Sequence, residues 1–138
     1  MIKRRYFVLC FLILLGCSKK ISKDQIIGNW WSIEEDSTYS EVYVNGAEWV
    51  INHESYGPIG YQYKLTDDSL FISDSMNSRL RIWKIVRSSS SSLVIKSNMA
   101  ERKLYKFKLN NSYFGALNDS VAYDNFEQEF IYRYLIRK

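Results

Sequence analysis

The 138-residue chain has only one histidine, one proline and six glycines. Its single histidine, His53, excludes a metal site built from several histidines. Its single proline excludes a proline-rich linker, and no glycine-rich loop is present to hold a phosphate group. The adjacent carboxylates Asp67 and Asp68 lie in a stretch with turn composition, which explains them better than acid–base chemistry does. We therefore expect no enzyme activity, no cofactor and no metal.

No apolar run is long enough to span a membrane. The apolar stretch near the N-terminus covers ten residues, 7–16, whereas a membrane-spanning helix needs about 20. It follows the basic segment MIKRRY and has no polar face, which argues against a buried core helix. A short basic segment followed by such a run is typical of a secretory signal peptide. We expect residues 1–16 to be a signal helix that is removed by cleavage.

Excess charge of one sign is also lacking once this segment is set aside. The full chain carries 19 Lys and Arg against 15 Asp and Glu, a net charge of +4. Three of the basic residues, Lys3, Arg4 and Arg5, belong to the signal segment, so 16 remain against 15 and the net charge falls to +1. A nucleic-acid-binding protein needs a concentrated basic face. We therefore expect no nucleic-acid partner.

The residues Leu14-Leu15-Gly16-Cys17 resemble the lipobox of bacterial lipoproteins. The resemblance implies that the Cys17 sulfur receives a diacylglycerol, that the chain is cut just before Cys17, and that the new amino group is acylated, for example with palmitate. Several acyl chains hold a protein firmly on a membrane that it does not span. An ordinary secretory signal that leaves Cys17 as a free thiol is the alternative.

The residues around Cys17 bear on location. Ser18 resembles the residue found in lipoproteins sorted to an outer membrane, and the following lysines do not resemble the acidic export tag of some Bacteroidetes lipoproteins. The resemblance implies a bacterial cell-envelope protein, anchored in the outer membrane and facing the periplasm. Cys10 is lost with the signal peptide, so the mature chain has no cysteine pair for a disulfide. Residues 17–25 are expected to form a lipidated tether.

The rest of the chain reads as short strands separated by polar turns, because apolar and polar residues alternate with a period of two. Asn45-Gly46 is a strong hairpin signal, and five serines, Ser88–Ser92, form another connection. Strands at roughly ten-residue spacing predict an all-β antiparallel meander that forms a sandwich or a barrel. The expected strands cover residues 26–35, 38–45, 47–53, 60–65, 69–73, 80–87, 93–97 and 103–109.

The C-terminal extension, from about residue 111, is ambiguous. Asp119 or Ser120 would cap a helix that starts there, whereas FIYRYLI is rich in residues that favour strands. We expect a helical turn near 119–127 followed by a closing strand near 129–137. A continuous helix to the C-terminus is the alternative.

The segment Ile27-Gly28-Asn29-Trp30 has the Gly-x-Trp pattern that opens the first strand of lipocalins. The order YQYKLTDDSLFIS, a strand containing Trp83 and Ile85, then SSLVI and LYKFKL is also similar to small bacterial lipocalin-like, calycin-type domains. This resemblance covers residues 26–109 and implies that the meander rolls into a lipocalin-like β-barrel, so that residues 26–138 form one domain. Closure would remove exposed strand edges.

The lipocalin resemblance also implies a structural plug at one end of the barrel. In that family the tryptophan of the Gly-x-Trp pattern closes the barrel against an arginine from the last strand. Here Gly28 and Trp30 would occupy the plug position. Arg133 or Arg137 would supply the cation if the C-terminus forms the last strand.

The aromatic side chains allow two functions: we expect the first, ligand binding, and the second, a structural role, is the alternative. In a wide barrel, six of them would line an apolar pocket for a small hydrophobic ligand, which the protein would bind or shield without covalent chemistry. In a tight barrel the same residues would be core, and the protein would be a structural lipoprotein that binds another envelope protein. These six residues are Trp49, Tyr61, Tyr63, Trp83, Tyr105 and Phe107.

Overall fold

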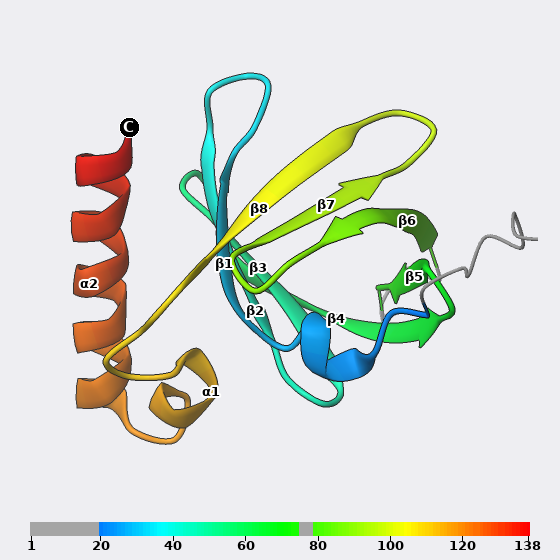
Figure 1. Ribbon diagram of the computed structural model, residues 1–138. Coiled ribbons are helices and arrows are strands. Elements are labelled where there is room, and N and C mark those ends of the chain that lie inside the picture. The colour runs from blue at the N-terminus through cyan, green and yellow to red at the C-terminus, as the bar shows by residue number, and fades with distance from the viewer. Residues whose placement is uncertain (1–19, 75–78) are drawn as a thin grey trace, which may run out of the picture.

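The computed structural model describes residues 20–74 and 79–138, so the expected signal peptide and Cys17 lie outside the described residues. Within the described part, the chain forms eight strands followed by a long helix (Figure 1). The elements are η1 (Lys23–Gln25), β1 (Gly28–Ile33), β2 (Tyr39–Val44), β3 (Glu48–His53), β4 (Gly57–Thr66), β5 (Ser69–Ser73), β6 (Leu80–Ser88), β7 (Ser92–Lys96), β8 (Glu101–Phe107), α1 (Tyr113–Ala116) and α2 (Ser120–Arg137).

The eight strands form a closed barrel in which each strand pairs with its neighbours in sequence. Every pairing is antiparallel, and β8 closes the barrel against β1, where Trp30 lies opposite Lys106. An eight-stranded up-and-down barrel is the lipocalin architecture. The predicted all-β meander rolled into a lipocalin-like barrel is therefore confirmed.

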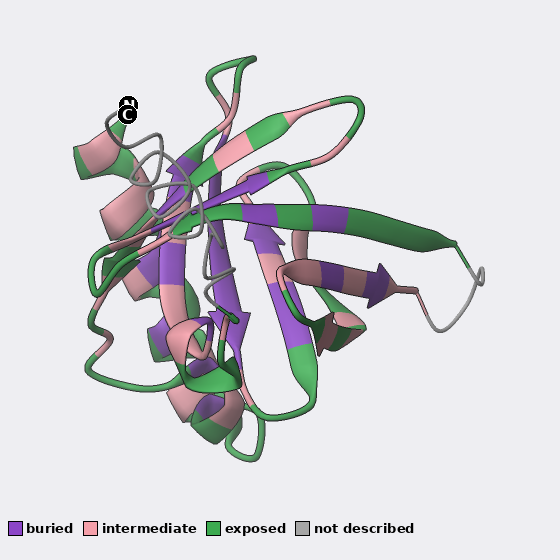
Figure 2. Cartoon of the chain, turned by 45° about the vertical axis from the view of Figure 1, so that its right-hand side comes forward, coloured by how far each residue is buried: buried purple, intermediate pink, exposed green. Residues whose placement is uncertain are grey.

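Inward-facing positions alternate with outward-facing ones along every strand of a barrel. In this barrel the inward-facing positions hold mainly apolar side chains. The interior core consists of Ile26, Trp30, Val42, Val44, Trp49, Leu70, Ile72, Trp83, Ile85, Leu93, Ile95 and Leu104, all buried. Figure 2 shows buried positions along the strands, whereas the connecting loops are largely exposed or half-buried.

The C-terminal segment packs as a helix beside the barrel, and the predicted closing strand at 129–137 is wrong. Residues 120–137 form the single helix α2, which was the alternative. Asp119 caps it, because its Oδ1 accepts hydrogen bonds from the Val121 and Ala122 amides at 2.8 and 3.0 Å. The pairing of β8 with β1 leaves no open edge for another strand. Of the apolar residues in the helix, Phe126 and Phe130 are the buried ones.

The helix and the outer barrel surface form a second apolar core. Tyr43 and Val50 point outward from β2 and β3 and pack against Tyr113, Ala116 and Phe126. Helix α2 runs along this side of the barrel (Figure 1). Part of the barrel is therefore covered by apolar groups on both faces.

The folded domain begins earlier than residue 26. Ile21 packs against the interior core. A capping box links Ser22 with Gln25, whose Oε1 accepts the Ser22 amide at 2.8 Å. The end of the segment expected as a tether, residues 17–25, thus contacts the barrel.

Candidate functional site

Trp30 fills the barrel at the end where η1 lies, which we call the closed end. Its side chain is fully buried, and its Nε1 donates a hydrogen bond of 2.9 Å to the Ile26 carbonyl. The ammonium of Lys106 lies 5.1 Å from the ring centroid, within cation–π range. Gly28 has a φ of 137°, and a Cβ there would lie 3.0 Å from Lys106 Cε. Glycine therefore permits both the backbone conformation and the approach of the lysine.

The predicted partnership of Arg133 with Trp30 is wrong. The cation over Trp30 is Lys106, which belongs to the true last strand, β8. Because the C-terminus is a helix outside the barrel, Arg133 lies over Phe107 and Phe126 at 5.6 and 5.7 Å. Arg137 lies over Trp31 at 4.8 Å. Lys106 could have been found from its inward position in the alternating pattern KLYKFKL.

Four of the six predicted pocket residues face the barrel interior. Trp49 and Trp83 are buried, and Tyr61 and Tyr63 pack against them partly exposed. Tyr105 and Phe107 were placed on the wrong face.

Their position outside the barrel follows from the register of β8. Tyr105 pairs with Trp31 and stacks on it at 4.9 Å, on the outside. Phe107 belongs to the core beneath the helices, while Leu104 occupies the interior. A shift of one residue exchanges the two faces of a strand, so Tyr105 and Phe107 cannot line an interior pocket.

The interior is filled. The gap between its inward-facing side chains has a volume of about 10 Å³, whereas pockets for small organic ligands measure about 300–1,000 Å³. A gap of this size holds about one water molecule. It is lined by Val42, Trp49, Ile51, Tyr61, Ile72, Arg81, Trp83, Ile95, Arg102 and Leu104.

Two arginines lie at the end of the barrel opposite Trp30, which we call the mouth. Arg81 lies over the Tyr61 ring at 5.8 Å, and Arg102 lies over the Trp83 ring at 5.5 Å. Arg102 pairs with Glu34 at 3.1 Å. Among the described residues, no carboxylate is within ion-pair distance of Arg81. Of the two guanidinium groups at the mouth, that of Arg102 is paired with a carboxylate of the described residues and that of Arg81 is not. Both lie beside the mainly apolar residues that line the interior gap.

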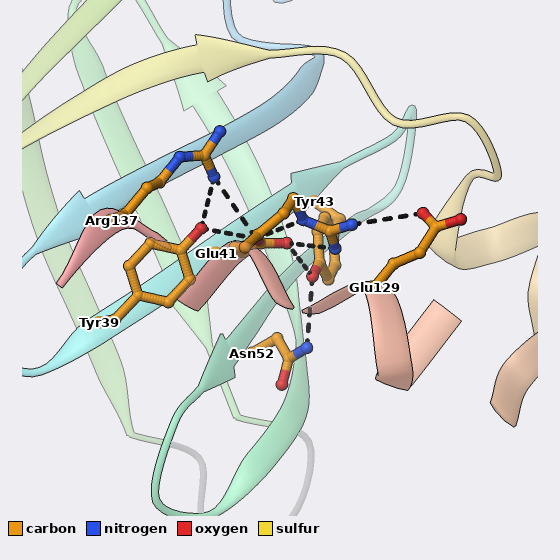
Figure 3. Close-up of polar contacts among 7 residues, drawn as sticks. Tyr39, Glu41, Tyr43, Asn52, Glu129 and Arg137 are labelled. Carbon is orange, nitrogen blue, oxygen red and sulfur yellow. Dashed lines mark hydrogen bonds and ion pairs between the residues drawn. The ribbon is translucent and has the colours of Figure 1, made fainter. Parts of the chain in front are cut away.

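A buried carboxylate lies on the outer face of β2, beneath α2 (Figure 3). Glu41 is fully buried, and its two oxygens accept hydrogen bonds of 2.6 Å from the Tyr39 and Tyr43 hydroxyls. Arg133 binds both oxygens, through Nε at 2.8 Å and Nη2 at 3.0 Å. Arg137 Nη1 lies 3.7 Å from Oε1. The network joins the barrel to the helix.

The environment of this network shifts the titration of its members. Burial, and then the negative charge of Glu41, raise the pKa of Tyr39 and the pKa of Tyr43 well above the usual tyrosine value. Burial acts to lower the pKa of Arg133, but its hydrogen bond to Glu41 and the charge of Glu41 raise it overall. The native network therefore keeps both phenols neutral and the guanidinium charged.

This network was not predicted from the sequence. Its signal is the alternation Tyr39-x-Glu41-x-Tyr43, which places a carboxylate between two phenols on one strand face. Arg133 and Arg137 are four residues apart, on one face of a helix. Once a helix is assumed, the two patterns have complementary charge.

The other titratable groups considered in the sequence, His53, Asp67 and Asp68, are not part of the Glu41 network. His53 stacks on Tyr56 at 4.2 Å, and its Nε2 lies 3.3 Å from Thr38 Oγ1. Asp68 pairs with Lys84 at 3.4 Å, and Asp67 occupies the β4–β5 turn with a φ of 53°. Within residues 20–74 and 79–138, no group of three His, Cys, Asp or Glu side chains is arranged to hold a metal ion.

No protein-family model and no curated protein matches this sequence. Its structure is similar to that of a lipocalin-like protein from Bacteroides uniformis ATCC 8492, with 15% sequence identity and a TM-score of 0.45. The match covers 60% of this chain and 99% of that one. The assignment of a lipocalin-like fold rests on the strand order and closure described above.

Proposed function

We propose that this protein is a lipid-anchored protein of a bacterial envelope, with a filled barrel that supports contacts made by its outer surface with another envelope protein. The observation that carries this proposal is the interior gap of about 10 Å³. Enclosing a fatty acid or a pigment would require several buried side chains to leave the barrel. A hydrophobic-ligand carrier therefore fits the geometry less well than a scaffold does.

The outer surface offers apolar groups that the fold does not use. In the last two turns of α2, Ile131, Tyr132, Leu135 and Ile136 are between 47% and 66% exposed. Clustered apolar groups in contact with water are characteristic of protein contact surfaces. We do not propose catalysis at the Glu41 network, because its carboxylate is fully buried and accepts hydrogen bonds from Arg133 and two tyrosines.

The lipid anchor rests on the basic segment, the apolar run and the lipobox-like residues that end at Cys17. None of the helices in the described part of the chain is long and apolar enough to cross a membrane. We expect metabolic labelling with an alkyne fatty acid to mark the wild-type protein and not the Cys17→Ala variant. Equal labelling of the two proteins would contradict the anchor.

The filled interior predicts that no apolar ligand enters the barrel. We expect native mass spectrometry of the acylated chain to detect no pigment enclosed in the barrel, and haem to leave the melting temperature unchanged. A ligand at about 100 times its dissociation constant would stabilise the protein by about 2.7 kcal/mol. A co-purified pigment, or a clear upward shift in melting temperature with haem, would favour ligand binding in the barrel over the scaffold function.

The mouth supports a second candidate, the binding of a small aromatic anion. Arg81 lies over Tyr61 and has no carboxylate partner in the described residues. A carboxylate there would gain a charge-assisted hydrogen bond. We expect benzoate, titrated by NMR, to shift the Trp83 indole resonance in the wild type and to bind about 5- to 10-fold more weakly to Arg81→Gln. The Arg87→Gln variant, on the same strand, is the control; equal affinities in all three proteins would exclude the site.

A further inference from the structure

A second depression lies at the closed end of the barrel, between the N-terminal segment and β4. This groove is open to solvent and has a volume of about 360 Å³. Its lining includes Ser22 and Lys23, at the start of η1, the blue helical turn near β4 in Figure 1. Its walls are formed by Lys20, Ile21, Ser22, Lys23, Tyr63, Lys64, Leu65 and Asp67.

The groove combines positive charge with an apolar base. Lys20, Lys23 and Lys64 are exposed on its walls, and Asp67 supplies the one carboxylate. Lys23 Nζ donates to the Gly46 carbonyl and lies 5.3 Å from the Tyr63 ring centroid, which directs it over the groove. Among the described residues, no carboxylate is within ion-pair distance of Lys20 or Lys64.

The apolar residues in this groove are Ile21 and Leu65, which are only partly buried. Ammonium groups beside half-buried aliphatic side chains match a ligand with an anionic head and an apolar body. An anionic phospholipid has this chemistry, because its phosphate lies next to glycerol and acyl carbons. A free phosphate would use the lysines but would leave the apolar base uncovered.

We propose that this groove binds the phosphate headgroup of an anionic lipid in the membrane that holds the protein. The inference rests on the proposed anchor at Cys17. Two residues, Ser18 and Lys19, lie between Cys17 and Lys20, and the three steps from one Cα to the next span at most about 11 Å when extended. The headgroup region of one leaflet is about 5–8 Å thick, so the anchor keeps the groove at the membrane surface.

This arrangement fixes the orientation of the barrel. The closed end would rest on the lipid headgroups, and the mouth with Arg81 and Arg102 would point away from the membrane. Lysines close to an anionic surface attract it strongly, and the attraction falls off within a Debye length of about 8 Å. Lys96 and Lys103 lie towards the mouth end of β7 and β8 and should not contact lipid.

The test uses the full chain, purified in detergent and reconstituted into vesicles of phosphatidylcholine with or without roughly one third phosphatidylglycerol. A membrane-impermeant amine reagent then labels the exposed lysines, and mass spectrometry gives the rate for each one. We expect labelling of Lys20 and Lys64 to slow about fivefold or more when phosphatidylglycerol is present. Lys96 and Lys103 should label equally in both membranes. Equal rates for Lys64 in the two membranes would overturn the proposal.

Two variants of the groove and one control variant test this result further. Asp67→Asn removes the opposing carboxylate, and asparagine tolerates the positive φ of this position. It should therefore increase the protection of Lys64. Lys20→Gln should reduce the protection of Lys64, whereas Lys96→Gln, which removes the same charge at the far end, should not. If Lys20→Gln and Lys96→Gln behave alike, general surface charge accounts for the effect and the groove does not.

Two further measurements distinguish a lipid headgroup from free phosphate and show whether the anchor is present. Millimolar inorganic phosphate added to the phosphatidylcholine vesicles should leave Lys64 unprotected; full protection would identify a free-phosphate site and overturn the lipid assignment. The intact mass of the same sample reports acylation. Missing acyl chains would refute the anchor, while equal lysine rates in an acylated sample would refute the groove alone.

Discussion

Replacing Arg133 with methionine is expected to lower the free energy of unfolding by about 3 to 5 kcal/mol. The change removes both short hydrogen bonds that Arg133 makes to Glu41 and leaves that carboxylate fully buried beneath α2. Arg137 is the remaining cation, at 3.7 Å, and it is too distant for an equally good hydrogen bond. Urea unfolding, followed by tryptophan fluorescence, measures the loss.

A double variant separates an unpaired charge from a loss of packing. Glu41→Gln combined with Arg133→Met removes the buried charge and keeps an acceptor for the tyrosine hydroxyls. Removing both charges of a buried pair is far less costly than removing one, so at least half of the lost stability should return. Arg137→Met, which removes a more exposed cation, should cost less than Arg133→Met. A single variant as stable as wild type would show that the pair does not hold the helix.

The protein is expected to lose stability steeply as the pH rises above about 10. Tyrosines in the unfolded chain ionise near pH 10, whereas burial and the adjacent charge of Glu41 raise the pKa of Tyr39 and Tyr43 in the native state. Above pH 10 the native state therefore holds more protons than the unfolded state. The stabilisation is complete below pH 10 and falls by up to about 1.4 kcal/mol per pH unit for each tyrosine.

Urea unfolding at intervals from pH 8 to beyond pH 11 measures this slope. Tyr43→Phe is the matched variant, since it preserves the ring against Phe126 and removes one titrating group. It should be less stable at neutral pH, because Asn52 and Glu41 lose a hydrogen-bond partner. Its stability should also decline less steeply above pH 10. Identical slopes for variant and wild type would contradict the role of Tyr43.

Most strands were predictable because one of their sides is exposed or half-exposed, so apolar and polar residues alternate along them; β2, which is buried on both sides, is the exception. Alternation in β4 placed Tyr61 and Tyr63 correctly on the interior face. The hairpin signal at Asn45 was also correct: its Oδ1 accepts the Ala47 and Glu48 amides. Strand β8 was misread because its outer face is also covered by aromatic groups. Hydrophobicity alone cannot then distinguish the inside of the barrel from the surface beneath the helix.

The prediction of a strand in the C-terminal segment was wrong for a related reason. Its β-favouring residues predicted a strand, but intrinsic preference is weak compared with the burial available in the folded protein. With β8 already paired to β1, the segment buries Phe126 and Phe130 best as a helix. As a result, Arg133 binds the buried carboxylate of Glu41 and does not reach the barrel plug. The cation beside the plug residue Trp30 is Lys106.

The sequence by itself determined the antiparallel meander, because alternation and turn residues act over a few neighbouring positions. Only the tertiary structure decided which faces point inward, how little space the interior leaves, and where Arg133 binds. Those features depend on closure of the barrel, on side-chain volumes summed across all eight strands, and on a contact between Glu41 and Arg133, 92 positions apart. Such distances are set by the assembled fold, and no local pattern of residues encodes them.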